Sequence, residues 1–559
     1  MQLGFDPRKD VAVMNDSPVR WRYGRRVRLI AGVALAGATI TGVAACGSSE
    51  PTPSASVFPT GTPSEVSSAT TGFAAPNGDL SNTRAVGGKI DSSNIATLTE
   101  AWSMPLGGQS TFGVFSSNPI VTGDTVYLQD INSNVFAVDR TTGKKKWTRT
   151  LDDATTGPNG VAIGGGLVVA PTATGVVALD AATGEIKWQK KLTAQSSEGV
   201  DMAPLIWNDT VIISSVPGAS LANFYGGGGM GIVYALDLAT GKQKWSFNTT
   251  TDNLWGNPEV NTGGGLWATP SVDDEGNIYL GVANPGPWAG TKEYPNGTSR
   301  PGDNLYTNSL VVLDGRTGKL KWYWQAIKHD LRDWDLHLSP ILADFDIGGT
   351  STPVVVVGGK MGTVYVVDRT THKLIWQTDV GKHTPEAGAK DGKGTANDPG
   401  PGKNAPFTSF PTTVYPGWLG GVETNMAVSE GVIYVPVNNL CSIYTAQANF
   451  TEGSGLCDFK TAGGELVALD GATGKVVWGK DVGNMNYGGA TVVNDTVVTI
   501  TFEGKIQAFN KADGTAVWTK QMPAYANATP AIADDMIVAG AGFAAGEGQK
   551  PAVVAYKLP

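Results

Sequence analysis

Five side chains between Trp267 and Lys360 could do chemistry together, and none of them lies in the repeated units of the chain. Trp267 follows three glycines in GGGLW, and Asn284 lies in the turn ANPGPW. Asp333 and Asp335 alternate in DWD, so both would lie on one side of an extended segment, where two carboxylates repel unless a cation lies between them. The amide oxygen of Asn284 can ligate a hard cation, and an indole beside glycines offers a stacking face. These residues predict a site for a cation and a flat ligand.

Each of these residues also has a purely structural interpretation, which the sequence leaves open. Trp267 could lie in the core between two sheets, although it does not end a repeat. Asn284 could bond its own backbone, as Asn in such turns usually does. The three aspartates of KHDLRDWD, which include Asp330, could form a solvated acidic loop, and Lys360 could be a surface residue.

A repeated unit must position these residues. In each copy an alternating strand ends at an Asp or Asn, a T-G type turn follows, and a second strand ends in Trp eight residues later, as in VVALDAATGEIKW. Strand alternation and the turn predict a β-hairpin with a Trp between adjacent sheets. The Trp residues that end these copies are Trp147, Trp188, Trp245, Trp322, Trp376, Trp478 and Trp518.

An eighth Trp, Trp102, has no hairpin before it, while the end of the chain supplies strands with no Trp after them. The simplest solution is that the strand holding Trp102 completes the C-terminal sheet. We therefore predict an all-β fold, an eight-bladed β-propeller with tryptophan-docking repeats. Pairing of an N-terminal strand with the C-terminal blade would close it.

Composition agrees with short strands and tight turns, because the 559 residues include 74 glycines and only 16% are charged. The net charge of −9 and the pI near 5.1 give no basic surface for nucleic acid. No nucleic-acid partner is expected.

Residues 1–46 have the form of an export signal, with arginines, an apolar stretch and VAAC ending at Cys46. This resembles a bacterial lipobox and implies a lipid on Cys46. A transmembrane anchor is the alternative, since the apolar run of about 17 residues is near the lower limit for spanning. The Arg25-Arg26 pair leaves twin-arginine export open. Either route places the folded part outside the cytoplasm, and the lipid would anchor it to the cell membrane.

Residues 47–72 are rich in Ser, Thr and Pro and are predicted to be a flexible linker. Beyond it, Cys441 and Cys457 are the only cysteines, and in an oxidising compartment a disulfide is favoured over two free thiols. The chain contains no CxxCH motif for covalent haem.

The repeats, the segment DLSNTRAVGGKIDSSNIATLTEAW and the stretch from Trp267 to Lys360 together resemble the quinoprotein alcohol dehydrogenases, over residues 73–559. That family forms eight-bladed propellers that bind pyrroloquinoline quinone (PQQ). The resemblance implies that Trp267 lies under the quinone and that Lys360 reaches its oxygens. By the same resemblance, Asn284, Asp333 and Asp335 would bind Ca²⁺ or a lanthanide ion, and Asp333 would be the general base.

The sequence departs from this family in the earlier repeats. The segment YGGGGMG places about Gly226 where the family has a metal-binding Glu, and Met230 where it has an Arg. The adjacent cysteine pair that caps the quinone in many members is absent, and Asn159 stands where an Arg is expected. The resemblance is therefore strong in the fourth and fifth blades and weak in the early ones.

Two functions from different classes follow. The first is an exported, membrane-tethered PQQ- and metal-dependent dehydrogenase that oxidises an alcohol or sugar-like substrate. With no haem domain, it would pass electrons to a separate acceptor, a cytochrome or a quinone. The second is a non-catalytic propeller lipoprotein that binds a protein or an envelope component, because such propellers share the same repeats.

Overall fold

The computed structural model describes residues 59–69, 71–108, 112–220, 225–384, 406–447, 453–545 and 548–559. The chain divides into Met1–Val57 and Phe58–Pro559, and every described residue belongs to the second unit. The predicted signal segment, with Cys46, lies outside the described residues. In the part of the chain that is described, no helix has the length and apolar character needed to cross a membrane.

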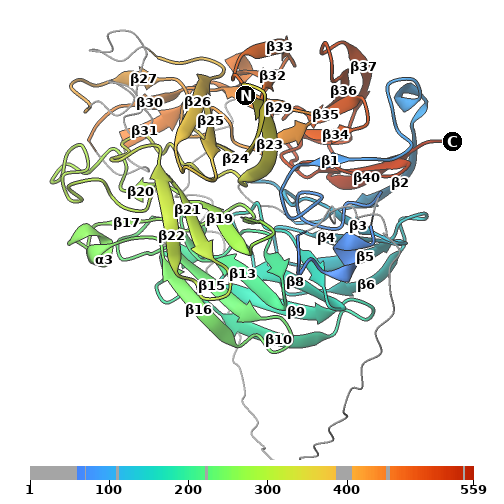
Figure 1. Cartoon of the computed structure of the whole chain (residues 1–559), viewed down its shortest axis with the longest axis horizontal. Helices are drawn as coiled ribbons and strands as arrows, with labels where there is room; N and C mark the ends of the chain where they lie inside the picture. Colours follow the sequence, from blue (N-terminus) through green and yellow to red (C-terminus); the bar gives the residue numbers. More distant parts are fainter. Residues whose placement is uncertain are drawn as a thin grey trace, which may run out of the picture. The chain divides into compact units, whose positions relative to one another are not determined.

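Eight antiparallel sheets, each with four strands that follow the repeats, make up most of the second unit (Figure 1). The all-β, eight-bladed propeller predicted from the sequence is confirmed. We number the sheets one to eight in chain order.

The first four sheets hold residues 120–325. Sheet one consists of β3 (Ile120–Thr122), β4 (Thr125–Gln129), β5 (Val135–Asp139) and β6 (Lys145–Arg149). Sheet two consists of β7 (Ala162–Gly164), β8 (Leu167–Thr172), β9 (Gly175–Asp180) and β10 (Ile186–Lys191). Sheet three consists of β12 (Leu205–Trp207), β13 (Thr210–Ser214), β15 (Ile232–Asp237) and β16 (Gln243–Asn248). Sheet four consists of β18 (Ser271–Val272), β19 (Asn277–Gly281), β21 (Ser309–Asp314) and β22 (Leu320–Gln325).

Sheets five to eight follow in chain order and complete the propeller. Sheet five consists of β23 (Ile341–Ile347), β24 (Thr350–Gly358), β25 (Thr363–Asp368) and β26 (Leu374–Asp379). Sheet six consists of β28 (Ala427–Ser429), β29 (Val432–Asn439), β32 (Gly463–Asp470) and β33 (Val476–Asp481). Sheet seven consists of β34 (Thr491–Val493), β35 (Thr496–Ile500), β36 (Lys505–Asn510) and β37 (Ala516–Gln521), with the short β1 (Ala85–Val86) parallel to β34. Sheet eight consists of β38 (Ala531–Ala533), β39 (Met536–Ala541), β40 (Ala552–Lys557) and β2 (Thr99–Pro105).

The strand that holds Trp102, β2, pairs antiparallel with the C-terminal strand β40. The N-terminal part of the chain therefore supplies the outer strand of sheet eight, as the Trp count predicted. In each of the other sheets the four main strands lie side by side in the order in which they occur along the chain.

Short elements lie between or beside the main sheets. Two of the small sheets pair β11 (Glu198–Gly199) with β14 (Val216–Pro217) and β17 (Thr262–Gly263) with β20 (Pro285–Gly286). A three-stranded sheet contains β27 (Thr412–Val414), β30 (Ser442–Tyr444) and β31 (Ser454–Leu456). The helical turns are α2 (Ser64–Ser67), η2 (Ile95–Thr97), α3 (Asp252–Trp255) and η3 (Phe459–Thr461).

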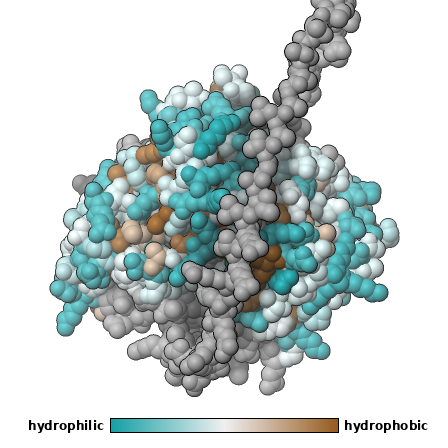
Figure 2. All heavy atoms as spheres, turned by 90° about the horizontal axis from the view of Figure 1, so that it is seen from below, coloured by the Kyte–Doolittle hydropathy of each residue, from teal (hydrophilic) through white to brown (hydrophobic). Residues whose placement is uncertain are grey.

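The strands of each sheet become less buried from the axis of the propeller outwards. The first strands of neighbouring sheets contact one another, for example β23 with β18 and with β28. These first strands are mostly buried, whereas the fourth strands, such as β10 and β37, are largely exposed. The face shown in Figure 2 is mainly hydrophilic or neutral, with smaller hydrophobic patches.

The repeat Trp residues join each sheet to the next. Where the pattern holds, the indole N–H donates to the carbonyl after the repeat Asp or Asn of the following sheet, as from Trp147 to Ala181 at 3.0 Å. The indole lies on the Gly of that turn, so a Cβ on Gly184 would be 2.6 Å from the Trp147 ring. This close approach explains why the turn contains Gly. The other Trp residues that donate in this way are Trp102, Trp188, Trp245, Trp376 and Trp478.

Sheet five departs from this pattern for a reason visible in its sequence. Its turn reads TTHK, and His372 stands where the other turns have Gly. The imidazole of His372 stacks on Trp322 with ring centres 4.3 Å apart, so a ring contact replaces the contact with glycine.

The segment 73–86 runs past the end of the axis. Asn77 donates to Ser339 at 3.0 Å and accepts from Asn425 at 3.0 Å, while Asn82 donates to the carbonyl of Thr269 at 3.1 Å. The fully buried Arg84 donates to Asn77 and to groups of sheets seven and eight. This segment therefore connects five sheets at one end of the ring.

Part of the predicted linker 47–72 differs from expectation. Val66 on α2 is buried, and the indole N–H of Trp207 donates to the carbonyl of Thr60 at 2.7 Å. Glu65 accepts from the backbone N–H of Gly166 at 2.7 Å. Residues 59–69 contact sheets two and three because this stretch contains an apolar side chain and a carboxylate that find partners there.

Candidate functional site

The residues singled out from the sequence come together where sheets four and five meet the axis. Trp267 precedes β18, and Asn284 lies between β19 and β20. Asp333 and Asp335 lie in the segment that leads from β22 into β23, and Lys360 lies in the turn between β24 and β25. All four polar residues are buried, with exposed fractions between 1% and 6%.

An ammonium group lies between the two carboxylates. Lys360 Nζ is 3.0 Å from Asp333 Oδ2 and 2.7 Å from Asp335 Oδ2. The backbone N–H of Asn284 donates to Asp335 Oδ1 at 2.5 Å, which ties the two sheets together. The cation that the DWD spacing requires is therefore, in part, Lys360 itself. We call Asn284, Asp333, Asp335 and Lys360 the acid-lysine cluster.

One carboxylate oxygen of the acid-lysine cluster has no hydrogen-bond partner among the described residues. Asp333 Oδ1 is buried and has no hydrogen-bond partner in the structure. Two carboxylates against one ammonium leave the cluster one positive charge short when both acids are ionised. Asn284 Oδ1 accepts from the hydroxyl of Tyr225 at 3.3 Å.

Burial changes the protonation of the cluster. It raises the pKa of Asp333 to about 7, against a lowering effect of Lys360 and with a further raising effect of Asp335. Burial alone would lower the pKa of Lys360, but Asp333 and Asp335 more than reverse this, so that its pKa lies well above the usual value. Lys360 therefore stays charged at neutral pH, and Asp333 can exchange a proton there.

Asp330 shapes the backbone that carries the cluster. Its carboxylate accepts from the backbone N–H groups of Arg332 and Trp334 at 2.9 and 2.8 Å. Asp333 between them has a φ of +62°, a conformation that side-chain-bearing residues rarely adopt. Buried Arg300 donates to the carbonyl of Asp330 at 2.5 Å and so links this turn to the loop that begins at residue 300.

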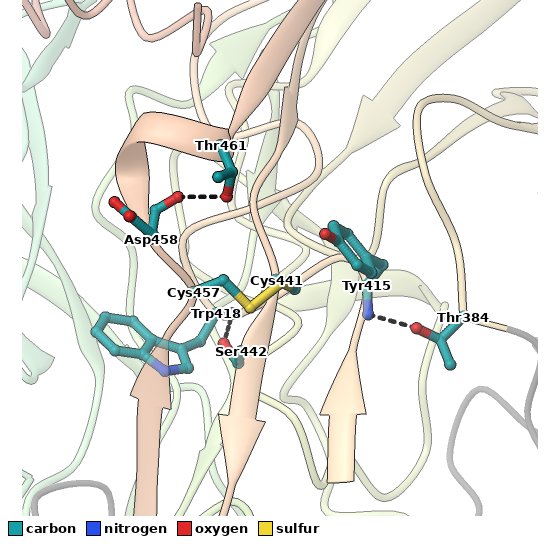
Figure 3. Close-up of a disulfide and its surroundings, with 8 residues drawn as sticks. All are labelled: Thr384, Tyr415, Trp418, Cys441, Ser442, Cys457, Asp458 and Thr461. Atoms are coloured by element: carbon teal, nitrogen blue, oxygen red, sulfur yellow. Dashed lines mark hydrogen bonds between the residues drawn. A yellow bond between two sulfur atoms is a disulfide. The ribbon is translucent and has the colours of Figure 1, made fainter.

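A disulfide-closed sheet holds the same turn from outside. Cys441 and Cys457 form a disulfide beside β30 and β31 (Figure 3). In this region the hydroxyl of Tyr444 donates to the carbonyl of Arg332 at 3.1 Å, and the indole N–H of Trp334 donates to the carbonyl of Pro416 at 3.0 Å. The residues on either side of Asp333 are therefore both held by the segment that contains the disulfide.

One face of Trp267 is covered by His337. The two rings are stacked, with centres 3.8 Å apart and planes 3° from parallel. Lys360 Nζ lies 5.2 Å from the centre of the Trp267 ring, and apolar side chains of Val216, Ala219 and Ala283 contact it. Burial lowers the pKa of His337 to about 4, so the stacked imidazole is neutral.

A cavity of about 480 Å³, including space open to solvent, lies along the axis beside this stack. Its wall comes from the segments that precede the first strands of sheets one to six and eight. Trp267, His337 and Glu423 hold equivalent places in it, each four residues before the first strand of its sheet. The same position in the remaining sheets is occupied by Ser116, Pro158, Asp201, Tyr487 and Asn527.

Side chains of this wall are polar but carry no positive charge, since neither Lys nor Arg is among its residues. Buried oxygen atoms of Ser116, Asn159, Glu423 and Asn527 have no hydrogen-bond partner. The amides of Asn159 and Asn527 are oriented by donation to the carbonyls of Asp130 and Phe112. The wall therefore presents acceptors.

Comparison with known proteins gives the family of this chain. A profile described as the β-propeller domain of glucose, ethanol and alcohol dehydrogenases matches residues 193–409. A second profile, described as outer membrane protein assembly factor BamB, matches residues 48–228 and 307–557. The chain is 31% identical over 487 residues to the quinoprotein alcohol dehydrogenase PedH of Pseudomonas putida, covering 77% of this chain and 78% of that protein. The chain belongs to the PQQ-dependent alcohol dehydrogenase family.

Other members and solved structures agree. The quinoprotein ethanol dehydrogenase of Pseudomonas putida is 29% identical over 499 residues, which cover 77% of this chain and 78% of that protein. The crystal structure of the quinohemoprotein alcohol dehydrogenase of Comamonas testosteroni has a TM-score of 0.74 at 23% identity, covering 88% of this chain and 81% of that chain. A europium-containing methanol dehydrogenase has a TM-score of 0.72 at 22% identity, covering 87% and 98%. At these identities the structures support the fold.

The acid-lysine cluster fits the metal ion that the PQQ-dependent alcohol dehydrogenase family implies. The unpartnered Asp333 Oδ1 and the missing positive charge are what a hard cation would satisfy. No three His, Cys, Asp or Glu side chains among the described residues converge on a metal position. The residues that would hold the ion are Asp333, Asp335 and the amide of Asn284.

The residues also fit a flat cofactor on one side. Trp267 lines the cavity with a ring that His337 covers on one face. On the opposite side the wall lacks cations, in agreement with Asn159 standing where an Arg was expected.

Three residues of the site were missed in the sequence: Tyr225, His337 and Glu423. Counting back four residues from the first strand of each repeat would have found His337 and Glu423, because Trp267 holds the same place. No sequence signal indicates Tyr225, which lies outside any repeat. At the departures noted above, Met230 donates its backbone N–H to Glu198, and Gly226 supplies no side chain.

Proposed function

We propose that this protein is an exported, membrane-tethered PQQ- and metal-dependent dehydrogenase that oxidises an alcohol or sugar-like substrate. The observation that carries the proposal is the buried carboxylate of Asp333, which has one unpartnered oxygen and pairs with Lys360 beside Asp335 and Asn284. Membership of the PQQ-dependent alcohol dehydrogenase family supports the reaction class.

Each residue of the cluster then has a task. Asn284, Asp333 and Asp335 would hold Ca²⁺ or a lanthanide ion, and Trp267 would stack on PQQ, which when bound supplies the hydride acceptor. Asp333 would take the proton of the substrate hydroxyl as general base. Lys360 keeps a fixed positive charge where negative charge develops.

Export and tethering are proposed from the sequence. VAAC ending at Cys46 supports lipid attachment, and the disulfide between Cys441 and Cys457 suits an oxidising compartment. Because the chain lacks a CxxCH haem motif, electrons would leave through a separate cytochrome or quinone.

The second candidate is a non-catalytic propeller lipoprotein that binds a protein or envelope component. The match of the BamB profile to residues 48–228 and 307–557 and the cavity wall without cations favour it. It predicts no affinity for PQQ.

Reconstitution tests the proposed function. The purified full chain is incubated with PQQ and either Ca²⁺ or La³⁺, and the reduction of a dye is followed on addition of primary alcohols and sugars. We expect stoichiometric PQQ uptake and alcohol-dependent dye reduction. Asp333→Asn should reduce turnover by about 10²–10⁴-fold, the usual contribution of a general base.

The control is Asp344→Asn, which alters an exposed carboxylate on β23. Turnover of this variant should equal that of the wild-type protein. If the wild-type chain takes up no PQQ with either metal, the dehydrogenase proposal fails and the propeller lipoprotein is favoured.

A further inference from the structure

Tyr225 reaches the acid-lysine cluster from sheet three's side of the ring, and it directly precedes Gly226 in the segment YGGGGMG. Its hydroxyl donates to Asn284 Oδ1 at 3.3 Å. The carboxylates of Asp333 and Asp335 act on the same hydroxyl electrostatically. The Tyr225 hydroxyl is therefore joined to the cluster through the side chain of Asn284, whose backbone N–H donates to Asp335.

The ring of Tyr225 occupies a slot that other side chains would close. A Cβ on Gly218 would lie 2.6 Å from the ring and 3.1 Å from the hydroxyl oxygen, and one on Gly286 would lie 3.3 Å from the ring. Trp288 meets the ring edge to face, with centres 4.9 Å apart and an angle of 85°. Two glycines and an indole thus fix where the hydroxyl oxygen lies.

The separation of the two oxygens suits one shared cation. Oxygens that ligate the same Ca²⁺ at about 2.3–2.6 Å and subtend roughly a right angle are about 3.3–3.7 Å apart. The 3.3 Å between the hydroxyl of Tyr225 and Asn284 Oδ1 is within this range. The other end of the Asn284 amide donates to the carbonyl of Pro285 at 3.2 Å, which leaves Oδ1 turned towards Tyr225.

We propose that Tyr225 is a ligand of the metal ion, and that its hydroxyl oxygen binds the cation together with Asn284 Oδ1 and the carboxylates of Asp333 and Asp335. This inference rests on the proposed function, because it concerns the same cation. It gives the site an oxygen from sheet three's side, where Gly226 offers no side chain.

The test measures metal binding rather than turnover. Ca²⁺ and Tb³⁺ are titrated into the full chain, with and without PQQ, by calorimetry and by Tb³⁺ luminescence. Tyr225→Phe keeps the ring in its slot and removes only the hydroxyl, so we expect the affinity to fall by about tenfold or more. Luminescence lifetimes in H₂O and D₂O should show that one additional water binds Tb³⁺ in this variant.

Tyr323→Phe is the matched control, because Tyr323 lies exposed on β22 and should leave affinity and hydration unchanged. Equal affinity and equal hydration of Tb³⁺ in wild-type protein and Tyr225→Phe would overturn the assignment while leaving the dehydrogenase proposal intact. Lower affinity with unchanged hydration would also overturn it, since the hydroxyl would then only orient Asn284. Absence of metal binding by the wild-type chain would overturn both proposals.

Discussion

The two sides of the central site are built on different principles. In the acid-lysine cluster, from sheets four and five, charged groups pair at 2.7 to 3.0 Å and one carboxylate oxygen stays free. The cavity wall contributed by sheets one, two, six and eight has no Lys or Arg, and several of its buried oxygens have no partner. Charge pairs are concentrated on one side, and the other side has neither Lys nor Arg.

This difference indicates which residues of the central site can be replaced independently and which cannot. A buried ion pair is stable only when both charges are present, so each residue of the cluster depends on the others. The wall has no such mutual dependence, and its residues can differ from those of relatives without breaking the fold. The departure at Asn159 lies in the wall, whereas Gly226 stands where the family has a metal ligand.

Lys360→Met should have the largest effect on stability, because it leaves two buried carboxylates without their ammonium. We expect the free energy of unfolding to fall by about 3–5 kcal/mol, the usual result of removing one partner of a buried pair. Urea denaturation measures this, and Lys319→Met, at an exposed position, should be neutral. A loss below 1 kcal/mol would show that the pairing does not hold the cluster together.

Loss of the disulfide should destabilise the part of the molecule that holds the acid-lysine cluster. The disulfide lies beside the sheet of β27, β30 and β31, and this region holds Arg332 and Trp334 on either side of Asp333. With a sequence separation of 16 residues, we expect Cys441→Ser with Cys457→Ser to cost about 3 kcal/mol. Thermal unfolding measures this. Turnover of the reconstituted protein should also fall, whereas an unchanged turnover would separate the disulfide from the position of Asp333.

Trp267→Ala tests the residue that contacts both the acid-lysine cluster and the cavity wall. Removing the stacking face should weaken PQQ binding by about tenfold, because aromatic stacking contributes about 0.5–1.5 kcal/mol beyond the area it buries. Fluorescence titration with PQQ measures this. Trp518→Ala serves as a matched control, since Trp518 contacts Tyr556 in sheet eight and not the cavity wall. Equal weakening in both variants would contradict a specific role for Trp267.

Glu423→Gln should have the smallest effect at low pH, where an amide replaces a neutral carboxyl group, and its effect should grow as the pH rises. Burial raises the pKa of Glu423 to about 8, so the folded protein binds a proton that the unfolded chain releases between about pH 4.5 and 8. Stability from this group is therefore present at low pH and is lost as the pH rises to 8. The difference in unfolding free energy between wild-type protein and Glu423→Gln should change across this window.

Much of the fold was predictable because one unit is repeated. A Trp eight residues after an Asp gave the number of sheets, and Trp102 indicated that an N-terminal strand joins the C-terminal sheet. The sequence predicted Asp333, Asp335 and Asn284 as candidate cation ligands, and the structure brings them together with Lys360. The extent of the linker was predicted less well, because residues 59–69 find partners in sheets two and three that composition does not reveal.

The sequence by itself determined the repeats, the alternation of strands and the residue types of the cluster, since these are local properties of the chain. Only the tertiary structure decided that Lys360 lies between Asp333 and Asp335, that His337 covers Trp267, and that Tyr225 meets Asn284. The physical reason is that these contacts join separate sheets around one axis. Distances across that axis depend on how all eight sheets fit together, which no single segment specifies.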